Sequence, residues 1–313
     1  MESLNQADMI YDLSTIWAAV KEEFPYFEHL PFDWDEQYVS HLNKLLSVRD
    51  EAEFHQLLSD FMASLNDGHT KYIPPQEYRT DPPFVPPEPP SFTFQDGILT
   101  IRLNEFQHDH APYVRELLEA HPDCTLVRLD IRENIGGNTY YAANVAKLFI
   151  SGVFRGCQKW TQTRNAVNAA AASQLAGYSE ERLQQYLKDG LITEEDIADA
   201  RIIMGRMKYE TYTDEHSSED KVALYDGPLQ LLISRRTMSA AEDFTAMFKS
   251  NHRAMLIGEP TYGSTGTPYK IPLRCGGRAQ VVSVGYRLLN GTEFIGKGIM
   301  PDICKGSPKA AHP

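Results

Sequence analysis

The segment LVRLDIRENIGGNTYYAANVAKLFI, residues 126–150, is the most informative run of this chain. Its first part, Leu126 to Ile131, is rich in branched apolar residues and is typical of a buried strand. Gly136 and Gly137 then mark a tight turn, and the apolar residues from Thr139 to Ile150 recur at helical spacing. A strand that passes through a glycine turn into a helix is the repeating unit of an α/β sheet.

The same alternation of strand and helix continues on both sides of this segment. The expected strands are Gly97 to Leu103, Leu229 to Ser234, Met255 to Gly258 and Val281 to Leu289. The expected helices are Ala111 to Ala120 and Ala240 to Ser250. We therefore predict an α/β fold with a largely parallel sheet.

The rest of the chain divides into an N-terminal domain, a linker and an insertion. Residues 1–73 have apolar residues at helical spacing and are expected to form a helical domain. Residues 74–90 hold eight prolines, which block helices and sheet ladders, so this range is a linker and the best domain boundary. Residues 91–313 form the α/β core, in which residues 165–215 interrupt the alternation. That range is expected to be a helical insertion, either a lid or a structural embellishment.

The composition excludes several classes of protein. A hydrophobic content of 42% and a charged content of 23% are those of a soluble globular protein, and a net charge of -13 argues against nucleic-acid binding. Four dispersed cysteines without a CxxC pair favour reduced thiols in the cytoplasm. No signal peptide and no membrane-spanning run is visible, so we expect a cytoplasmic protein that does not contact the membrane.

Ser239 is the candidate nucleophile. It follows the apolar strand that ends near Ser234, and it precedes the helix Ala240 to Ser250. The free N–H groups at a helix start favour a developing negative charge. The alternative is an ordinary helix cap, since serine with Glu242 three residues later matches a capping box.

The glycines of the central segment are candidates for an oxyanion hole. Glycine lets backbone N–H groups face a cavity, which suits donors that must point to a developing charge. The alternative is a tight strand-to-helix turn without chemistry. The run is neither a dinucleotide-binding nor a phosphate-loop motif.

A base and an orienting acid complete the set expected of a serine hydrolase. His69 follows a helix that should end at Asn66–Asp67–Gly68, and Glu293 follows the turn Asn290–Gly291. Spacing cannot show whether Glu293 meets His69, since such residues come together only in three dimensions. His108–Asp109–His110 has no further ligand cluster, so no metal site is predicted.

Five short segments together resemble a known family. They are Asp67–Thr70 (DGHT), Asp130–Gly137 (D-x-R-x-N-x-G-G), Ser239–Phe244, Gly258–Gly263 (G-E-x-T-x-G) and Gly298–Asp302 (G-x-x-P-D). In this order they resemble the S41 peptidases, the family of tail-specific and C-terminal-processing proteases. The likeness is closest to the branch with the tricorn core protease and the interphotoreceptor retinoid-binding protein, and it covers nearly the whole chain. It implies a crotonase-like core, similar to ClpP and enoyl-CoA hydratase.

The resemblance also implies roles for individual residues. Ser239 would be the nucleophile, His69 the base and Glu293 the acid that orients the histidine. The N–H groups of Gly136, Gly137 and Ala240 would form the oxyanion hole.

Two features depart from the processing proteases. Ser264 stands where they carry the lysine of a Ser–Lys pair, which favours a Ser–His–Glu mechanism. The short segment after Thr70 leaves no room for the PDZ domain that many relatives carry.

The sequence therefore predicts a serine peptidase that acts on peptides or unfolded proteins through an acyl-enzyme, without a cofactor or metal. Self-association is left open. Two alternatives remain: a non-catalytic protein that binds apolar ligands on the same scaffold, and a hydrolase of small esters or amides. Phe92, Phe94, Phe106, Tyr140 and Tyr141 could line an apolar pocket or serve core packing.

Overall fold

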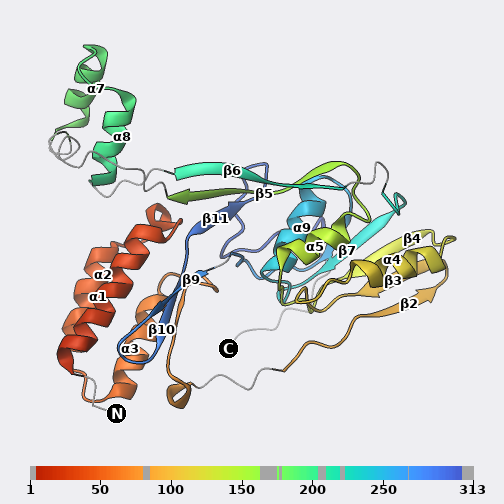
Figure 1. Cartoon of the computed structure of the whole chain (residues 1–313), viewed down its shortest axis with the longest axis horizontal. Coiled ribbons are helices and arrows are strands. Elements are labelled where there is room, and N and C mark those ends of the chain that lie inside the picture. Colours follow the sequence, from red (N-terminus) through yellow and green to blue (C-terminus); the bar gives the residue numbers. More distant parts are fainter. Residues whose placement is uncertain are drawn as a thin grey trace.

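A computed structural model describes residues 5–79, 85–162, 175, 178–203, 209–218, 223–266 and 268–304. Figure 1 shows the N-terminal helices on the left and the α/β half on the right, with the long strands β5 (Val153–Gln162) and β6 (Tyr209–Ser217) running along the top between them. Within the described ranges, no helix combines the length and apolar character needed to cross a bilayer.

Three helices form the N-terminal region: α1 (Gln6–Glu23), α2 (Trp34–Leu45) and α3 (Glu51–Ala63). Short 3-10 turns follow at Phe27–His29 and Gln76–Tyr78. Each helix begins at an Asn or Asp whose side chain accepts a backbone N–H, at Asn5, Asp33 and Asp50. These caps satisfy donors that a helix start leaves free, so the sequence fixes where each helix begins.

A hairpin from the far end of the chain completes this N-terminal core. Strand β1 (Lys71–Ile73) pairs antiparallel with β10 (Arg278–Val282), which pairs with β9 (Pro268–Pro272). Buried Ala279 and Val281 pack in one cluster with the three helices. Because β1 directly follows His69, this pairing ties the histidine segment to the C-terminal part of the chain.

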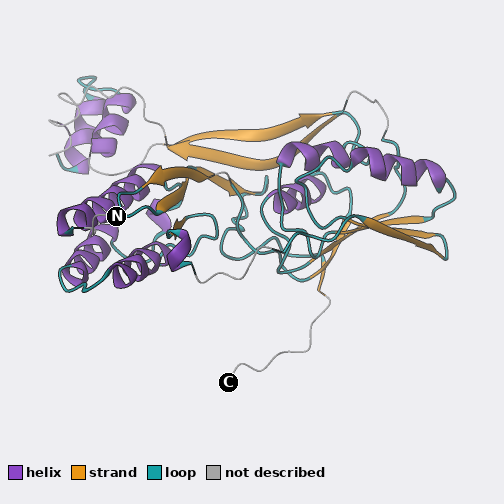
Figure 2. Cartoon of the chain, turned by 60° about the horizontal axis from the view of Figure 1, so that its bottom comes forward, coloured by secondary structure: helices purple, strands orange, loops and turns teal. Residues whose placement is uncertain are grey.

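The second core is a six-stranded sheet in the order β12-β8-β7-β4-β3-β2. Its parallel strands are β3 (Ile98–Arg102), β4 (Leu126–Asp130), β7 (Leu229–Ile233), β8 (Met255–Gly258) and β12 (Ile303–Cys304), and β2 (Ser91–Gln95) is antiparallel to β3. Helices α4 (Ala111–Ala120), α5 (Thr139–Ala146) and α9 (Ala240–Ser250) connect them and lie along the sheet (Figure 2). The predicted α/β class with a largely parallel sheet is confirmed.

A third sheet carries the insertion. Strands β11 (Val284–Arg287), β5 (Val153–Gln162) and β6 (Tyr209–Ser217) are antiparallel, and helices α7 (Glu180–Lys188) and α8 (Glu194–Ile203) lie between β5 and β6 in sequence. The predicted helical insertion is therefore only partly right, because its last residues form β6. Residues 163–174, 176–177 and 204–208 of this region lie outside the described residues.

The single strand predicted over Val281 to Leu289 is wrong. The chain leaves β10 at Val282 and enters β11 at Val284, and these strands belong to different sheets. Both strands bury side chains, so the apolar pattern continues from β10 into β11. The sequence alone therefore does not show that the chain passes from one sheet to another.

Candidate active site

Ser239 lies on a strained turn at the start of α9. Its backbone has φ 57° and ψ −130°, a conformation that a non-glycine residue rarely adopts. Its hydroxyl makes no capping bond, and its N–H donates to the carbonyl of Ser264 at 3.0 Å. Ordinary capping therefore does not account for this serine.

His69 reaches Ser239 across 170 positions of sequence. Its Nε2 lies 3.3 Å from Ser239 Oγ, and its Nδ1 lies 2.5 Å from Ser264 Oγ. The first distance is slightly longer than a working hydrogen bond, as is common in catalytic sites without substrate. The predicted serine and histidine are thus neighbours in the fold.

Ser264 and Asp67 continue this series of contacts on the Nδ1 side of His69. Ser264 Oγ donates to Asp67 Oδ1 at 3.0 Å, so the hydroxyl accepts from the Nδ1–H of His69. The Nε2 lone pair then faces Ser239. Asp67 also accepts the backbone N–H of His69 at 3.1 Å and the hydroxyl of Thr70 at 2.8 Å, which fixes the loop.

The electrostatics favour a neutral imidazole. Burial lowers the pKa of His69 below its ordinary value, and the Asp67 carboxylate opposes this shift only in part. A histidine that is unprotonated near neutral pH can accept the proton of a serine.

Glu293 does not occupy the place predicted for it. The partner of His69 Nδ1 is Ser264, whereas Glu293 Oε1 lies 3.7 Å from Nδ1 of His29 on a half-exposed surface. The adjacent Phe294 is fully buried, whereas the side chain of Glu293 is 37% exposed. The expectation that Glu293 orients the histidine is therefore not met in this structure.

The glycine turn approaches Ser239 closely. A Cβ on Gly136, whose φ is +91°, would lie 2.6 Å from Ser239 Cβ, so only glycine fits there. However, the N–H of Gly136 donates to Asn134 Oδ1 at 2.9 Å, so it is not free to bind an oxyanion as predicted. The N–H groups of Gly137 and Ala240 have no acceptor within the described part of the chain and are the available donors.

Glu242 binds the loop that carries Ser264. This fully buried carboxylate accepts the hydroxyl of Thr261 at 2.6 Å and the N–H groups of Gly263 and Ser264 at 2.8 Å each. Burial raises the pKa of Glu242 to about 7, although these bonds favour its ionised form. The carboxylate fixes the loop that presents Ser264 to His69.

Sequence reasoning gave no catalytic role to Asp67, Ser264 or Glu242. Asp67 is two residues before the histidine, where an aspartate commonly bonds its own turn, and this spacing was a usable signal. In the sequence, Ser264 is distinguished only by its place where the processing proteases carry a lysine.

His108 and His110 both contact Glu105 and stabilise a turn. Glu105 contacts His110 Nε2 at 2.6 Å and His108 Nδ1 at 3.1 Å, and it also accepts the N–H of Gln107. Across the described ranges, no three His, Cys, Asp or Glu side chains are grouped so that they could hold a metal ion.

Of the aromatic residues considered for an apolar pocket, Phe106 belongs to the core, whereas Phe92, Phe94 and Tyr140 are exposed. Phe106 is fully buried in the main core, and Phe92 and Phe94 pack their rings against His121. Tyr140 and Tyr141 pack edge-to-face on each other.

Comparison with known proteins assigns a family to this arrangement. The pattern of peptidase family S41 matches residues 97–304. A carboxyl-terminal-processing peptidase 1 of Arabidopsis thaliana is 36% identical over 85 residues, a match that covers 27% of this chain and 17% of that protein.

Several solved structures have the same fold at low identity. A candidate peptidase from Parabacteroides merdae has a TM-score of 0.69 at 18% identity, over 96% of this chain and 90% of the other. Mature CPAF in complex with lactacystin has a TM-score of 0.66 at 13% identity, over 96% and 94%. The photosystem II D1 C-terminal processing protease has a TM-score of 0.56 at 14% identity, over 95% and 92%.

Proposed function

Because this chain belongs to peptidase family S41, we propose that it cleaves peptide bonds through an acyl-enzyme on Ser239. The observation that supports this most directly is the chain of contacts from Ser239 through His69 and Ser264 to Asp67. It joins a nucleophile, a base and an orienting acid in the order that acyl transfer requires.

In the proposed mechanism, Ser239 Oγ attacks the carbonyl carbon and its proton passes to Nε2 of His69. The Nδ1–H remains bonded to Ser264, and the Asp67 carboxylate stabilises the positive charge that forms on the imidazole. His69 then gives the proton to the leaving amine. Water then gives a proton to His69 and attacks the acyl carbon. The bond to Ser239 Oγ breaks, His69 returns the proton to Oγ, and the acid product is released.

The tetrahedral oxygen is assigned to the N–H groups of Gly137 and Ala240. Ala240 directly follows Ser239, and Gly137 directly follows Gly136, whose added Cβ would lie 2.6 Å from Ser239 Cβ. Backbone donors held close to the nucleophile in this way need no rearrangement as charge develops. Loss of one such donor typically raises the barrier by about 2.7–4 kcal/mol.

The proposed substrate is an accessible peptide or an unfolded protein segment. Two proteins similar to this chain are named for processing of C-terminal ends, but only about twenty residues separate Thr70 from β2, too few for a PDZ domain. We place the protein in the cytoplasm, because all four cysteines are free thiols.

The test compares Ser239→Ala with the parent on an unfolded casein substrate, together with labelling by a fluorophosphonate. We expect Ser239→Ala to lose turnover and labelling while keeping its far-UV spectrum. Ser250→Ala is the matched control, because Ser250 is at the other end of α9, where its hydroxyl donates to Gly156 O at 3.1 Å.

Equal turnover by Ser239→Ala and the parent would refute the assignment. Hydrolysis of small esters without any cleavage of casein would instead favour the small-substrate hydrolase. Absence of labelling in the parent, together with tight binding of an apolar ligand, would favour the non-catalytic alternative.

A further inference from the structure

A cavity of about 570 Å³ lies at the carboxyl ends of β3, β4, β7 and β8. None of Ser239, His69, Gly136 and Ser264 is among its lining residues. In open α/β sheets, ligands bind where the carboxyl ends of neighbouring strands meet, and this volume is that of a small-molecule site. The cavity is therefore a candidate binding site separate from the candidate catalytic residues.

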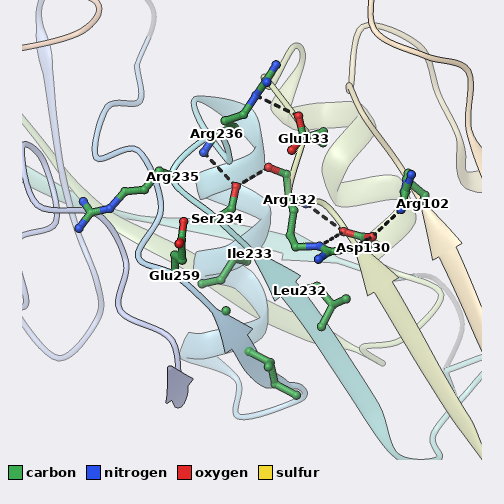
Figure 3. A pocket seen from close by; sticks show the side chains of 12 residues that line it. Arg102, Asp130, Arg132, Glu133, Leu232, Ile233, Ser234, Arg235, Arg236 and Glu259 are labelled. Atoms are coloured by element: carbon green, nitrogen blue, oxygen red, sulfur yellow. Dashed lines mark hydrogen bonds and ion pairs between the residues drawn. The ribbon is translucent and has the colours of Figure 1, made fainter. Parts of the chain in front are cut away.

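Asp130 organises the charged wall of this cavity (Figure 3). Its buried carboxylate accepts from Arg132 Nε at 2.8 Å and Arg132 Nη2 at 2.7 Å, and Arg102 Nη2 lies 3.4 Å away. Burial opposes ionisation of Asp130, but the Arg132 bonds outweigh it and hold the pKa of Asp130 below its ordinary value. One carboxylate thus contacts two guanidinium groups, which lie on either side of it (Figure 3).

The two guanidinium groups keep donors free for a ligand. Each guanidinium has five N–H donors. Asp130 takes only some of these, and within the described ranges no other acceptor contacts the guanidinium of Arg102 or Arg132. Both side chains remain nearly half exposed, at 44% and 47%.

A third arginine stands at the rim. Arg236 Nε pairs with Glu133 at 3.0 Å, and its backbone N–H donates to Ser234 Oγ at 3.0 Å. Ser234 Oγ in turn donates to the carbonyl of Arg132 at 2.5 Å. The loop that carries Ser234 and Arg236 is therefore hydrogen-bonded to the segment that carries Arg132.

The charge of the cavity is opposite to that of the protein. Four arginines line it against three carboxylates, which leaves one net positive charge in a chain whose net charge is -13. Guanidinium groups fixed in a plane match carboxylate and phosphate oxygens in paired hydrogen bonds. Leu232 and Ile257 add an apolar lining that suits the body of a small organic ligand.

We propose that this cavity binds a small anionic ligand through a carboxylate or phosphate group, with Arg102 and Arg132 as the main donors and Arg236 at the rim. The site stands independently of the peptidase mechanism, since it shares no residue with the proposed proton path.

The test is calorimetric titration of the full chain with inorganic phosphate and, separately, with succinate, at an ionic strength held constant with sodium chloride. We expect saturable binding of at least one probe with a Kd of roughly millimolar or tighter. The probe that binds more tightly identifies the preferred group, phosphate or carboxylate.

Arg102→Gln is the main variant, because Asp130 keeps its paired bonds to Arg132 and the fold is retained. We expect it to weaken binding by roughly tenfold or more, the effect of losing one charged hydrogen bond. Arg155→Gln is the matched control, since Arg155 pairs with Glu215 at 3.4 Å on the β5–β6 hairpin. Ser239→Ala should bind as the parent does, whatever its activity.

Absence of saturable binding for both probes up to roughly 50 mM would overturn the proposal. Binding that is unchanged in both Arg102→Gln and Arg132→Gln would also overturn it, because the anion would then be held elsewhere.

Discussion

Replacing Ser264 by alanine tests the proposed path of the proton more sharply than any other change. Ser264 is 1% exposed, and its hydroxyl joins His69 Nδ1 at 2.5 Å to Asp67 Oδ1 at 3.0 Å. In Ser264→Ala, the Nδ1–H loses its acceptor at the moment when the imidazole becomes positively charged. Asp67 keeps its bonds from His69 N–H and Thr70, so the loop should hold its shape.

The expected loss follows from these contacts. A hydrogen bond that involves a charged group contributes about 1.5–3 kcal/mol. At about 1.36 kcal/mol for each tenfold change in rate, kcat should fall by roughly ten- to one-hundred-fold. KM should change little, because Ser264 is proposed to act on the imidazole and not on the substrate.

Glu293→Gln provides the matched comparison. Glu293 is the acid that the sequence suggests, but among the residues that the structure describes, its half-exposed carboxylate pairs with His29 alone, at 3.7 Å. Exposed ion pairs of this kind contribute about 0–1 kcal/mol, so kcat should fall by less than roughly fivefold.

The assay is steady-state hydrolysis of a fluorogenic peptide, with the active serine counted by fluorophosphonate labelling. The reverse ranking, a large loss in Glu293→Gln and near-parent activity in Ser264→Ala, would refute the path through Asp67.

Further predictions concern the backbone and the buried acids of the site. Ser239→Gly should be more stable to urea than Ser239→Ala by about 1 kcal/mol, because glycine relieves the strain of φ 57°; equal midpoints would argue against strain. Gly136→Ala should lower the free energy of unfolding by about 1–3 kcal/mol and remove activity, since its Cβ would lie 2.7 Å from the carbonyl of Met238; an unchanged urea midpoint contradicts this. The kcat/KM profile should rise with pH to a plateau with its midpoint below 6.5, as His69 loses its proton; a midpoint above 7 contradicts the lowered pKa. Because the pKa of Glu242 rises from 4.5 to about 7 on folding, the folded state holds its proton more tightly, and stability should fall as pH rises from 4.5 through 7, by on the order of 3 kcal/mol. Urea unfolding at the two ends of that range should show this difference in the parent relative to Glu242→Gln, and parallel curves for the two proteins would contradict it.

The fold class and the candidate nucleophile can both be predicted from local patterns in the sequence. The strand, glycine turn and helix of residues 126–146 are local features, set by apolar periodicity and by the φ values that glycine permits. Ser239 is a candidate because it lies between β7 and α9, although this position alone also suits an ordinary helix cap. Such features depend on residues that are close together in the chain, so they can be predicted from a single sequence.

Which groups meet at His69 depends on the packing of segments that are far apart in the sequence. Ser264 is 195 positions away and reaches Nδ1 because buried Glu242 holds its loop and because β1 pairs with β10. The sequence favours Glu293 by resemblance, whereas in the fold its half-exposed carboxylate lies next to His29. The partners of a histidine depend on how separate segments pack, and packing is a property of the whole chain.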